Sequence, residues 1–521
     1  MSTDTAPATP APNAPRTEGA TIEVVSPVSG ERIGAVPVLD ERAVQHIVER
    51  ARIAQRSWGA RPLEERAERV ARLGEKLVER ADELVDVLMR EAGKPRNEAL
   101  AHEVLTTVDL CHYYTRNATK ILADETIDLH LLKHRRSYIT YVPMGVIGVI
   151  SPWNFPLVIP MGSVIEALIA GNAVVVKPSE VTPLIMMKAR EIAIDAGIPS
   201  DLFQVVTGDG KTGAALIDAG IQKMIFTGAV STGRRVAASC GERLVPCVLE
   251  LGGKAPLLAL EDCDVEHTAR AIVYGGFANS GQVCISVERV LAHEAIHDRL
   301  VDRVVKMTKR LRQGNPMESE VDVGAIIFPK QIDIAEAHIR DAVAKGAVVA
   351  TGGQRVPREG NFFEPTVLTN CRNDMTVMRE EIFGPIVPVM KIRDEEEAIR
   401  VANELDLGLN AYVFSRDRER ALRIAERIEA GTVMVNDVLS SYGAVEAPFG
   451  GIKNSGYGRV HSDASLKSLC YARHVNYDRV NVPVNDLLWY PYSDSKYRTV
   501  KGALKTLFSR HGFLGKLADL F

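Results

Sequence analysis

The 521-residue sequence lacks the features of membrane-spanning, metal-binding and nucleic-acid-binding proteins. No stretch approaches the roughly 18 uninterrupted apolar residues of a transmembrane helix. The seven cysteines form no CxxC pair and no His/Cys spacing typical of a metal site, so we expect free thiols in a reducing, cytoplasmic setting and no bound metal. Lys and Arg total 63 against 67 Asp and Glu, a net charge of −4, which predicts no nucleic-acid partner.

The N-terminal segment also lacks a targeting signal. Residues 1–19 contain neither the basic part nor the apolar part of a secretion signal, so we expect a disordered tail. The chain as a whole has an ordinary globular composition, with 46% apolar and 25% charged residues. A chain of this length is too long to fold around a single hydrophobic core, so two or three domains are predicted.

The hydrophobic periodicity changes once along the chain. Apolar residues at three- and four-residue spacing predict helices within 41–58 and 66–93. The segment 136–152 is rich in β-forming residues, and strands and helices alternate after it. Strands are predicted within 172–179, 202–208 and 223–228, and helices within 182–197 and 210–220. A second alternation follows Glu250, and the pattern predicts an α/β fold with parallel, helix-covered sheets.

Polar residues and glycines follow several of these strands. Because a doubly wound sheet binds its ligand at the carboxyl ends of its strands, such positions are candidates for a site. They are Lys177, Ser179 and Glu180 after one strand, Gly228 and Gly233 after another, and Glu250 after a third. The two glycines open a helix whose N–H groups can hold phosphate, although they do not form a G-x-G-x-x-G fingerprint.

Seven short segments together resemble one known family. They are "PWNFP" (152–156), "GNAVVVKPSE" (171–180), "FTG" (226–228), "LELGGK" (249–254), "GQVC" (281–284), "EEIFGP" (380–385) and "PFGG" (448–451). With these segments, in family order over about residues 22–475, the chain resembles the NAD(P)-dependent aldehyde dehydrogenase superfamily. The resemblance implies a Rossmann-type cofactor domain, an α/β catalytic domain and a small β oligomerisation flap.

The same resemblance implies three catalytic roles. Cys284 matches the nucleophile that forms a thiohemiacetal and then a thioester, Glu250 matches the general base, and Asn154 matches the donor to the oxyanion. Each residue has a structural alternative. These are an inert buried thiol, a capping or salt-bridged glutamate, and a turn asparagine beside Pro156. Because acyl transfer to coenzyme A generally goes with loss of this glutamate in the family, Glu250 favours hydrolysis to a free acid.

The cofactor implied by the resemblance is NAD, with NADP as the alternative. Lys177 and Glu180 match the pair that holds the adenosine ribose, and a carboxylate there disfavours a 2′-phosphate, although Ser179 could donate to one. The remaining matched positions are Gly228 and Gly233 at the pyrophosphate turn, Glu381 and Phe383 on the nicotinamide side, and Trp153 and Phe226 lining the cleft. Each aromatic has a core position as its alternative.

Three positions depart from the family pattern. Ala229 replaces the usual serine after "FTG", which weakens the expected hold on the pyrophosphate. Ser163 and Val460 replace a lysine and a glutamate found in many members. Because both are missing together, we expect Glu250 to exchange its proton through water or backbone.

The predicted domains are discontinuous. Residues 20–121 and 143–250 form the cofactor domain, 122–142 and 472–486 the flap, 251–471 the catalytic domain, and 487–521 an amphipathic extension. The flap implies a homodimer or homotetramer. The extension is basic, with Val500, Leu504, Leu507 and Phe508 on one helical side, and is expected to contact either an anionic membrane surface or a neighbouring subunit.

The substrate expected is an apolar aliphatic or aromatic aldehyde. The residues near the site, Phe155, Val283, Ile285 and 437–451, are mostly apolar or small and offer no basic anchor for a carboxylate. Two alternative functions stay open at this stage. One is a non-catalytic structural or binding member of the fold, and the other is a coenzyme A-acylating dehydrogenase.

Overall fold

The computed structural model describes residues 20–479 and 487–509. The predicted tail 1–19, part of the predicted flap (480–486) and the last part of the extension (510–521) lie outside the described residues. The chain divides into two compact units, with boundaries at Ala123/Asp124, Thr140/Tyr141 and Arg473/His474. The larger unit carries every candidate catalytic and cofactor residue named above. The separation of cofactor and catalytic domains within it stays a prediction.

The first half of the larger unit is built on a six-stranded sheet. Its strand order is β19 (Gly456–Tyr457), β9 (Cys247–Glu250), β8 (Lys223–Thr227), β5 (Val146–Ile150), β6 (Ala173–Lys177) and β7 (Phe203–Val205). All pairs are parallel except β19 with β9. Every residue of β6 is buried, as expected of a strand covered on both faces. The three strands predicted within 172–179, 202–208 and 223–228 are confirmed.

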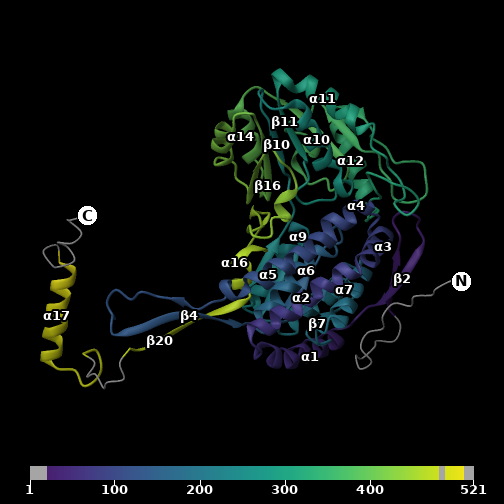
Figure 1. Cartoon of the computed structure of the whole chain (residues 1–521). Helices are drawn as coiled ribbons and strands as arrows, with labels where there is room; N and C mark the ends of the chain where they lie inside the picture. Colours follow the sequence, from purple (N-terminus) through teal and green to yellow (C-terminus); the bar gives the residue numbers. More distant parts are fainter. Residues whose placement is uncertain (1–19, 480–486, 510–521) are drawn as a thin grey trace. The chain divides into compact units, whose positions relative to one another are not determined.

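Helices cover both faces of this sheet. Gly148 and Ile150 of β5 contact residues of the segment that contains α8 (Gly210–Asp218), whereas the alternate residue Val149 lines a cavity with residues of α6 (Val158–Ala170). Further helices here are α1 (Glu41–Gly59), α2 (Leu63–Glu79), α3 (Ala81–Ala92), α5 (Thr106–Ile121), α7 (Leu184–Asp195) and α9 (Val230–Glu242) (Figure 1). The helical pattern of 66–93 forms the two helices α2 and α3, which meet at Arg80.

A seven-stranded sheet forms the second half of the larger unit. Its order is β12 (Val348–Thr351), β13 (Thr366–Thr369), β14 (Ile386–Ile392), β11 (Arg289–His293), β10 (Pro256–Ala259), β16 (Asn410–Phe414) and β17 (Thr432–Val435). Only β12 runs antiparallel to its neighbour. Its helices are α10 (Val265–Phe277), α11 (Glu294–Thr308), α12 (Lys330–Ala344), α14 (Glu395–Asn403) and α15 (Arg418–Ala425). Helices and mixed sheets together confirm the predicted α/β class.

The smaller unit contains most of a three-stranded antiparallel sheet and one helix. The sheet order is β20 (Cys470–Asp478), β4 (Arg135–Pro143) and β3 (Glu125–Thr126), and the helix is α17 (Asp494–Phe508). Ser493 caps α17 by accepting a hydrogen bond from the Lys496 N–H. Across the described parts of both units, no helix is long and apolar enough to span a bilayer.

Candidate active site

Cys284 lies in a loop whose backbone is held in an unusual conformation. After α10, the residues Asn279, Ser280 and Gly281 all have positive φ, at 48°, 56° and 72°. A Cβ atom on Gly281 would lie 2.2 Å from the Gly384 carbonyl, so the corner packs directly against the "EEIFGP" segment. Left-handed non-glycine residues are costly and cluster at functional sites, which makes this loop a candidate for holding a reactive group.

The "LELGGK" segment approaches the same loop from the other side. A Cβ on Gly253 would lie 2.3 Å from the Cys284 carbonyl oxygen, a distance that no side chain allows. Glycine at position 253 therefore permits the end of β9 to contact the backbone of the cysteine loop. The two motifs, separated by the 26 residues 255–280 in the sequence, are brought together here.

Asn154 is fixed behind the cysteine loop by hydrogen bonds. Its side-chain amide donates to the Gln282 carbonyl at 3.0 Å, and its backbone carbonyl accepts from the Asn279 side chain at 3.0 Å. Gln282 donates in turn to the Asn279 carbonyl and accepts from the Ile327 N–H. The Asn154 amide has a second N–H, and its role as donor to the reacting carbonyl stays a prediction.

A buried lysine holds the backbone of Asn154 in place. Lys94 Nζ donates to the Asn154 backbone carbonyl at 2.7 Å, lies 3.4 Å from a Glu103 carboxylate oxygen and sits over the Phe155 ring at 4.0 Å. The Glu103 carboxylate accepts from the Leu157 and Val158 N–H groups at the start of α6. Lys94 and Glu103 thus connect the "PWNFP" turn and the start of α6 to the segment 94–103. They are positioning residues that motif matching missed, and no motif in the segment 94–103 marks them.

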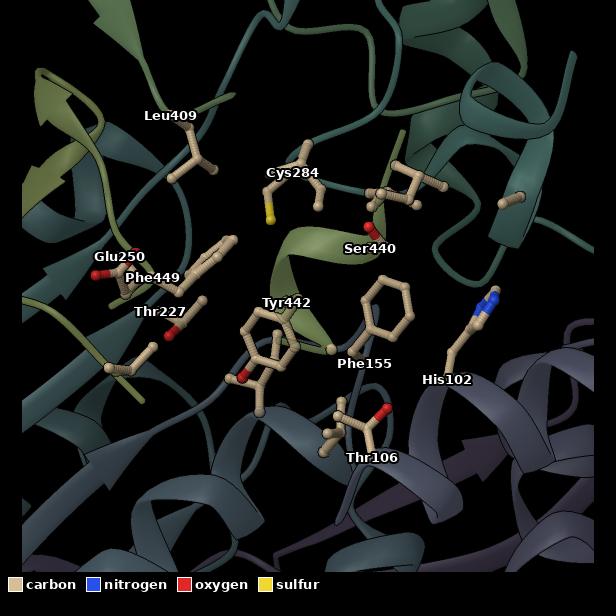
Figure 2. A pocket seen from close by; sticks show the side chains of 18 of the residues that line it. His102, Thr106, Phe155, Thr227, Glu250, Cys284, Leu409, Ser440, Tyr442 and Phe449 are labelled. Atoms are coloured by element: carbon tan, nitrogen blue, oxygen red, sulfur yellow. The ribbon is translucent and has the colours of Figure 1, made fainter. Parts of the chain in front are cut away.

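A cavity of about 370 Å³ opens in front of the cysteine. Figure 2 shows the Cys284 side chain among the side chains of Phe155, Tyr442 and Phe449. The lining extends from Thr227 and Glu250, at the ends of β8 and β9, to His102 and Thr106, near the start of α5. Cys284 is partly accessible because it faces this cavity, although protein atoms surround the rest of the residue.

The thiol and the glutamate have strongly shifted proton affinities. Burial, together with the nearby carboxylates of Glu381 and Glu250, raises the pKa of Cys284 to about 12. Burial also raises the pKa of Glu250 well above its ordinary value, against the opposing effect of Arg459. Both Glu250 carboxyl oxygens are buried and have no hydrogen-bond partner among the residues that the structure describes, which is unusual for a buried carboxyl group and common at functional sites.

Glu250 and Cys284 line one cavity, but their reactive atoms do not face each other. In Figure 2 the Glu250 carboxyl group lies beside Phe449 and points away from the Cys284 sulfur. Its Oε1 lies 2.7 Å from where a Cβ on Gly450 would be, so the carboxyl packs against "PFGG". In this arrangement the carboxyl group and the sulfur belong to one cavity, and the role of Glu250 as general base stays a prediction.

Glu381 lies beside the "LELGGK" turn. Its carboxylate accepts from the Gly253 N–H at 3.0 Å, and burial and the neighbouring Glu288 raise its pKa to about 8. Glu288 accepts from the Ile382 and Phe383 N–H groups and pairs with the buried Lys254 at 2.9 Å. This pair, which sequence reasoning also missed, holds "EEIFGP" against the turn.

The candidate cofactor residues gather at one edge of the six-stranded sheet. Strand β5 lies between β6 and β8, so the chain order reverses at its carboxyl end, which is where such sheets bind ligands. Lys177 at the end of β6 donates to Glu180 at 3.0 Å, and Ser179 accepts from the Val181 N–H. Across β5, Gly228 follows β8. These residues fit a dinucleotide laid across the end of β5.

The helix after Gly228 has an N-terminus free for an anion. Ala229 is its N-cap and supplies no side-chain hydrogen bond, so the first N–H groups of α9 are open to a phosphate. Gly233 serves packing instead, because a Cβ there would lie 2.5 Å from Leu251. The departure at Ala229 therefore removes one side-chain donor and leaves the backbone donors in place.

The three candidate aromatics have different surroundings. Trp153 and Phe383 form an edge-to-face pair with centroids 5.2 Å apart, and Phe383 has a positive φ of 54°. Phe226 is only 3% exposed and belongs to the hydrophobic core beneath Gly228. Side chains on alternate strand residues face opposite ways, and the neighbouring Ile225 and Thr227 line the cavity in front of Cys284. The place of Phe226 in the cofactor cleft stays a prediction.

Comparison with known proteins identifies the family. The family model for the aldehyde dehydrogenase family matches residues 14–475. The chain belongs to the aldehyde dehydrogenase family. This confirms the family and the fold predicted from the seven segments, and the activity is NAD(P)-dependent oxidation of an aldehyde. The expected catalytic and cofactor residues of this aldehyde dehydrogenase stay predictions, supported by the geometry above.

Three similar proteins illustrate the range of the family. A 4,4'-diapolycopene aldehyde oxidase from Methylomonas is 38% identical over 496 residues, covering 95% of this chain and 92% of its own length. A protein from Mycolicibacterium smegmatis, named for succinate semialdehyde and NADP(+), is 37% identical over 442 residues, covering 84% and 85%. The NAD+ complex of an aldehyde dehydrogenase from Bacillus cereus is 34% identical with a TM-score of 0.85, covering 89% and 94%.

Proposed function

We propose that this aldehyde dehydrogenase oxidises an apolar aldehyde with NAD and releases the free carboxylic acid. The observation that carries the proposal is one cavity lined by a partly accessible cysteine, mainly apolar side chains and a buried glutamate that has no hydrogen-bond partner in the described part of the chain. The alternative of a non-catalytic member of the fold does not account for a reactive loop held in this conformation.

The chemistry follows from three side chains. The Cys284 thiol loses its proton to water as its sulfur bonds to the aldehyde carbon, and the Asn154 amide and the Cys284 N–H donate to the oxyanion of the resulting thiohemiacetal. NAD, when bound, supplies the hydride acceptor that converts this adduct to a thioester. Glu250 takes a proton from water, the resulting hydroxide attacks the thioester carbon, and the carbon–sulfur bond breaks to release the acid.

NAD is favoured over NADP by the charge at the ribose end of the site. Glu180 is about half exposed at the end of β6 and ion-paired with the buried Lys177. A 2′-phosphate placed beside this carboxylate would be repelled, and a 2′-hydroxyl would donate to it. The relative from Mycolicibacterium named for NADP(+) shows that the family accommodates both.

An apolar substrate is favoured by the absence of a cationic anchor. No Lys or Arg lines the cavity in the described part of the chain. The basic residue there is His102, whose pKa is lowered to about 4 by burial and by Lys94, so it is neutral near pH 7. A carboxylate-bearing aldehyde would meet only the acidic Glu250 and Asp437. The relative named for the apolar diapolycopene aldehyde accords with this choice.

Water is the proposed route for the Glu250 proton. Ser163 and Val460, two of the three positions that depart from the family pattern, line the same cavity as Glu250. Neither carries a group that titrates, so the proton leaves through cavity water. Installing lysine at 163 and glutamate at 460 should leave kcat within about threefold, and a large gain would contradict this route.

The smaller unit is proposed to join subunits and to contact membrane. Strand β20 is an edge strand with Tyr477 46% exposed, which suits pairing with a second copy into dimers or tetramers. On α17, Tyr497, Val500, Leu504 and Phe508 form an exposed apolar side, flanked by Lys496, Arg498, Lys501 and Lys505. Co-sedimentation with vesicles containing anionic lipid, with and without residues 495–521, tests the membrane contact; equal binding by both chains would favour a subunit contact.

The proposed reaction is tested by following NADH and product together. Purified enzyme with NAD should form NADH only when aldehyde is present, and Cys284→Ala should form none. The product should be the free acid without added coenzyme A. A thioester formed only in the presence of coenzyme A would instead support the acylating alternative.

A further inference from the structure

Two cysteines outside the candidate active site lie on a helix and a strand that pack against each other. Cys240 is in the C-terminal part of α9 and is fully buried, and Cys247 is the first residue of β9 and is partly exposed. Residues 241–246 connect them through a tight turn, in which the Val245 N–H donates to the Cys240 carbonyl at 2.9 Å. The proposed reaction uses neither thiol.

The packing of α9 on β9 directs the two thiols toward each other. A Cβ on Gly233 would lie 2.5 Å from Leu251, so the start of α9 contacts the residue that follows β9. Cys240 lies seven residues beyond Gly233, about two helical turns, and therefore on the same face of α9. Cys247 lies four residues before Leu251 and faces the same way, because side chains alternate along a strand. The Cys240 thiol accordingly donates a hydrogen bond to the Cys247 sulfur.

The surroundings of Cys247 favour its thiolate form. The Tyr457 hydroxyl, on the adjacent strand β19, lies 2.9 Å from the Cys247 sulfur, and the buried Lys223 begins the strand β8 on the other side. The hydrogen bonds from Cys240 and Tyr457, with the nearby Lys223 cation, lower the pKa of Cys247 to about 6 against the opposing effect of burial. A partly exposed thiolate is the form of cysteine that peroxides oxidise.

We propose that Cys247 and Cys240 form a peroxide-reactive pair that closes reversibly to a disulfide. The Cys247 thiolate attacks one oxygen of a hydroperoxide and becomes a sulfenic acid, while the O–O bond breaks and the other oxygen takes a proton and leaves as water or an alcohol. The Cys240 sulfur then bonds to the Cys247 sulfur and displaces its hydroxyl, which takes the Cys240 proton and leaves as water. Two thiols are thus oxidised and one hydroperoxide is reduced, and a dithiol reductant reverses the change.

The turn between the two cysteines can follow this bond. Leu244 is 91% exposed, and a Cβ on Gly241 would meet nothing within 4 Å, so little packing holds residues 241–246 in place. The disulfide would connect the C-terminal end of α9 to the start of β9. Because neither cysteine is among the candidate catalytic or cofactor residues, the pair can be tested independently of the proposed function.

Trypsin separates the two cysteines, which makes the test direct. It cleaves after Arg235, Arg243 and Lys254, so Cys240 lies in the peptide 236–243 and Cys247 in the peptide 244–254. The reduced full-length protein is treated at neutral pH with a small molar excess of hydrogen peroxide, blocked with N-ethylmaleimide, digested and analysed by mass spectrometry. We expect at least tenfold more of the two peptides joined by a disulfide than in untreated protein, and we expect dithiothreitol to separate them.

Three substitutions provide the controls. Cys247→Ser should give no joined peptide and should leave Cys240 labelled. Cys240→Ser should stop at the sulfenic acid of Cys247, which dimedone traps. Cys263→Ser removes a buried thiol that follows β10 and should leave the amount of joined peptide unchanged. A circular dichroism spectrum equal to that of the native chain shows that each variant has folded.

Three outcomes overturn the inference. Full labelling of both cysteines after peroxide treatment would mean that the pair does not react. A sulfinic acid on Cys247 with Cys240 still labelled would mean that Cys240 does not reach it. On a non-reducing denaturing gel the oxidised protein should migrate as a single chain, and a cross-linked dimer lost in Cys247→Ser would mean that the bond forms between two copies.

Discussion

Replacing Glu250 by glutamine keeps the shape of the side chain and removes its ability to accept a proton. Both carboxyl oxygens lie buried without a partner at the cavity, so the substitution breaks no hydrogen bond within the described structure. A positioned general base contributes about 100- to 10,000-fold in rate, equivalent to about 2.7–5.4 kcal/mol of activation free energy. We expect steady-state kcat to fall within this range.

The assay separates the two halves of the reaction. Because the Glu250 carboxyl points away from the sulfur and toward "PFGG", it should serve the water step more than the thiol step. Stopped-flow absorbance should therefore show a burst of about one NADH per subunit, followed by slow turnover. The matched control is Glu166→Gln, which alters another buried carboxyl, bonded to Tyr114 and Ser465 away from the cavity, and should leave kcat within about threefold. An unchanged steady state in Glu250→Gln would refute the reasoning.

Three further predictions follow from the same contacts. Burial raises the folded-state pKa of Glu250 above its unfolded value of about 4.3. The stability that the protonated carboxyl group contributes to the folded state is therefore present below pH 4 and is lost as pH rises. Glu250→Gln should resist urea better than the native chain at pH 8 but not at pH 4. Because the pKa of Cys284 is about 12, its alkylation by iodoacetamide without cofactor should rise tenfold per pH unit from pH 7 to 10, and a plateau near pH 8 would contradict this. Lys94→Met removes one partner of a buried pair and should cost about 3–5 kcal/mol in urea unfolding, part of which Lys94→Met with Glu103→Gln should recover.

Much of the fold was predictable because the local sequence patterns and the tertiary packing favour the same strands and helices. The strands β6, β7 and β8 and the helices α7 and α8 lie where apolar periodicity and flanking glycines predicted them. The candidate catalytic residues could be predicted from the sequence for another reason. Motif segments mark the turns where β9 and the loop after α10 must approach each other, and Gly253 is required there by that contact.

What the sequence could not predict depends on contacts between distant segments. Lys94 follows α3 and Glu103 lies in the π-helical turn Ala99–Leu105, and both reach the segment 154–158 across more than 50 residues of sequence, a contact that no local pattern encodes. The face of the sheet toward which Phe226 points depends on the register of β8, and the motif does not specify that register. Thr106 and Gly443 lie more than 300 residues apart in the sequence and line the same cavity, which only the folded chain shows.

The central claim is that the Cys284 sulfur carries the acyl group before water removes it. The most direct test is acid quenching of Glu250→Gln after mixing with NAD and an apolar aldehyde, followed by mass spectrometry of its peptides. We predict one acyl adduct per subunit, on the peptide that contains Cys284, and its absence when NAD is omitted. An adduct on any of the other six cysteines, or none on Cys284 while NADH still forms, would contradict the account.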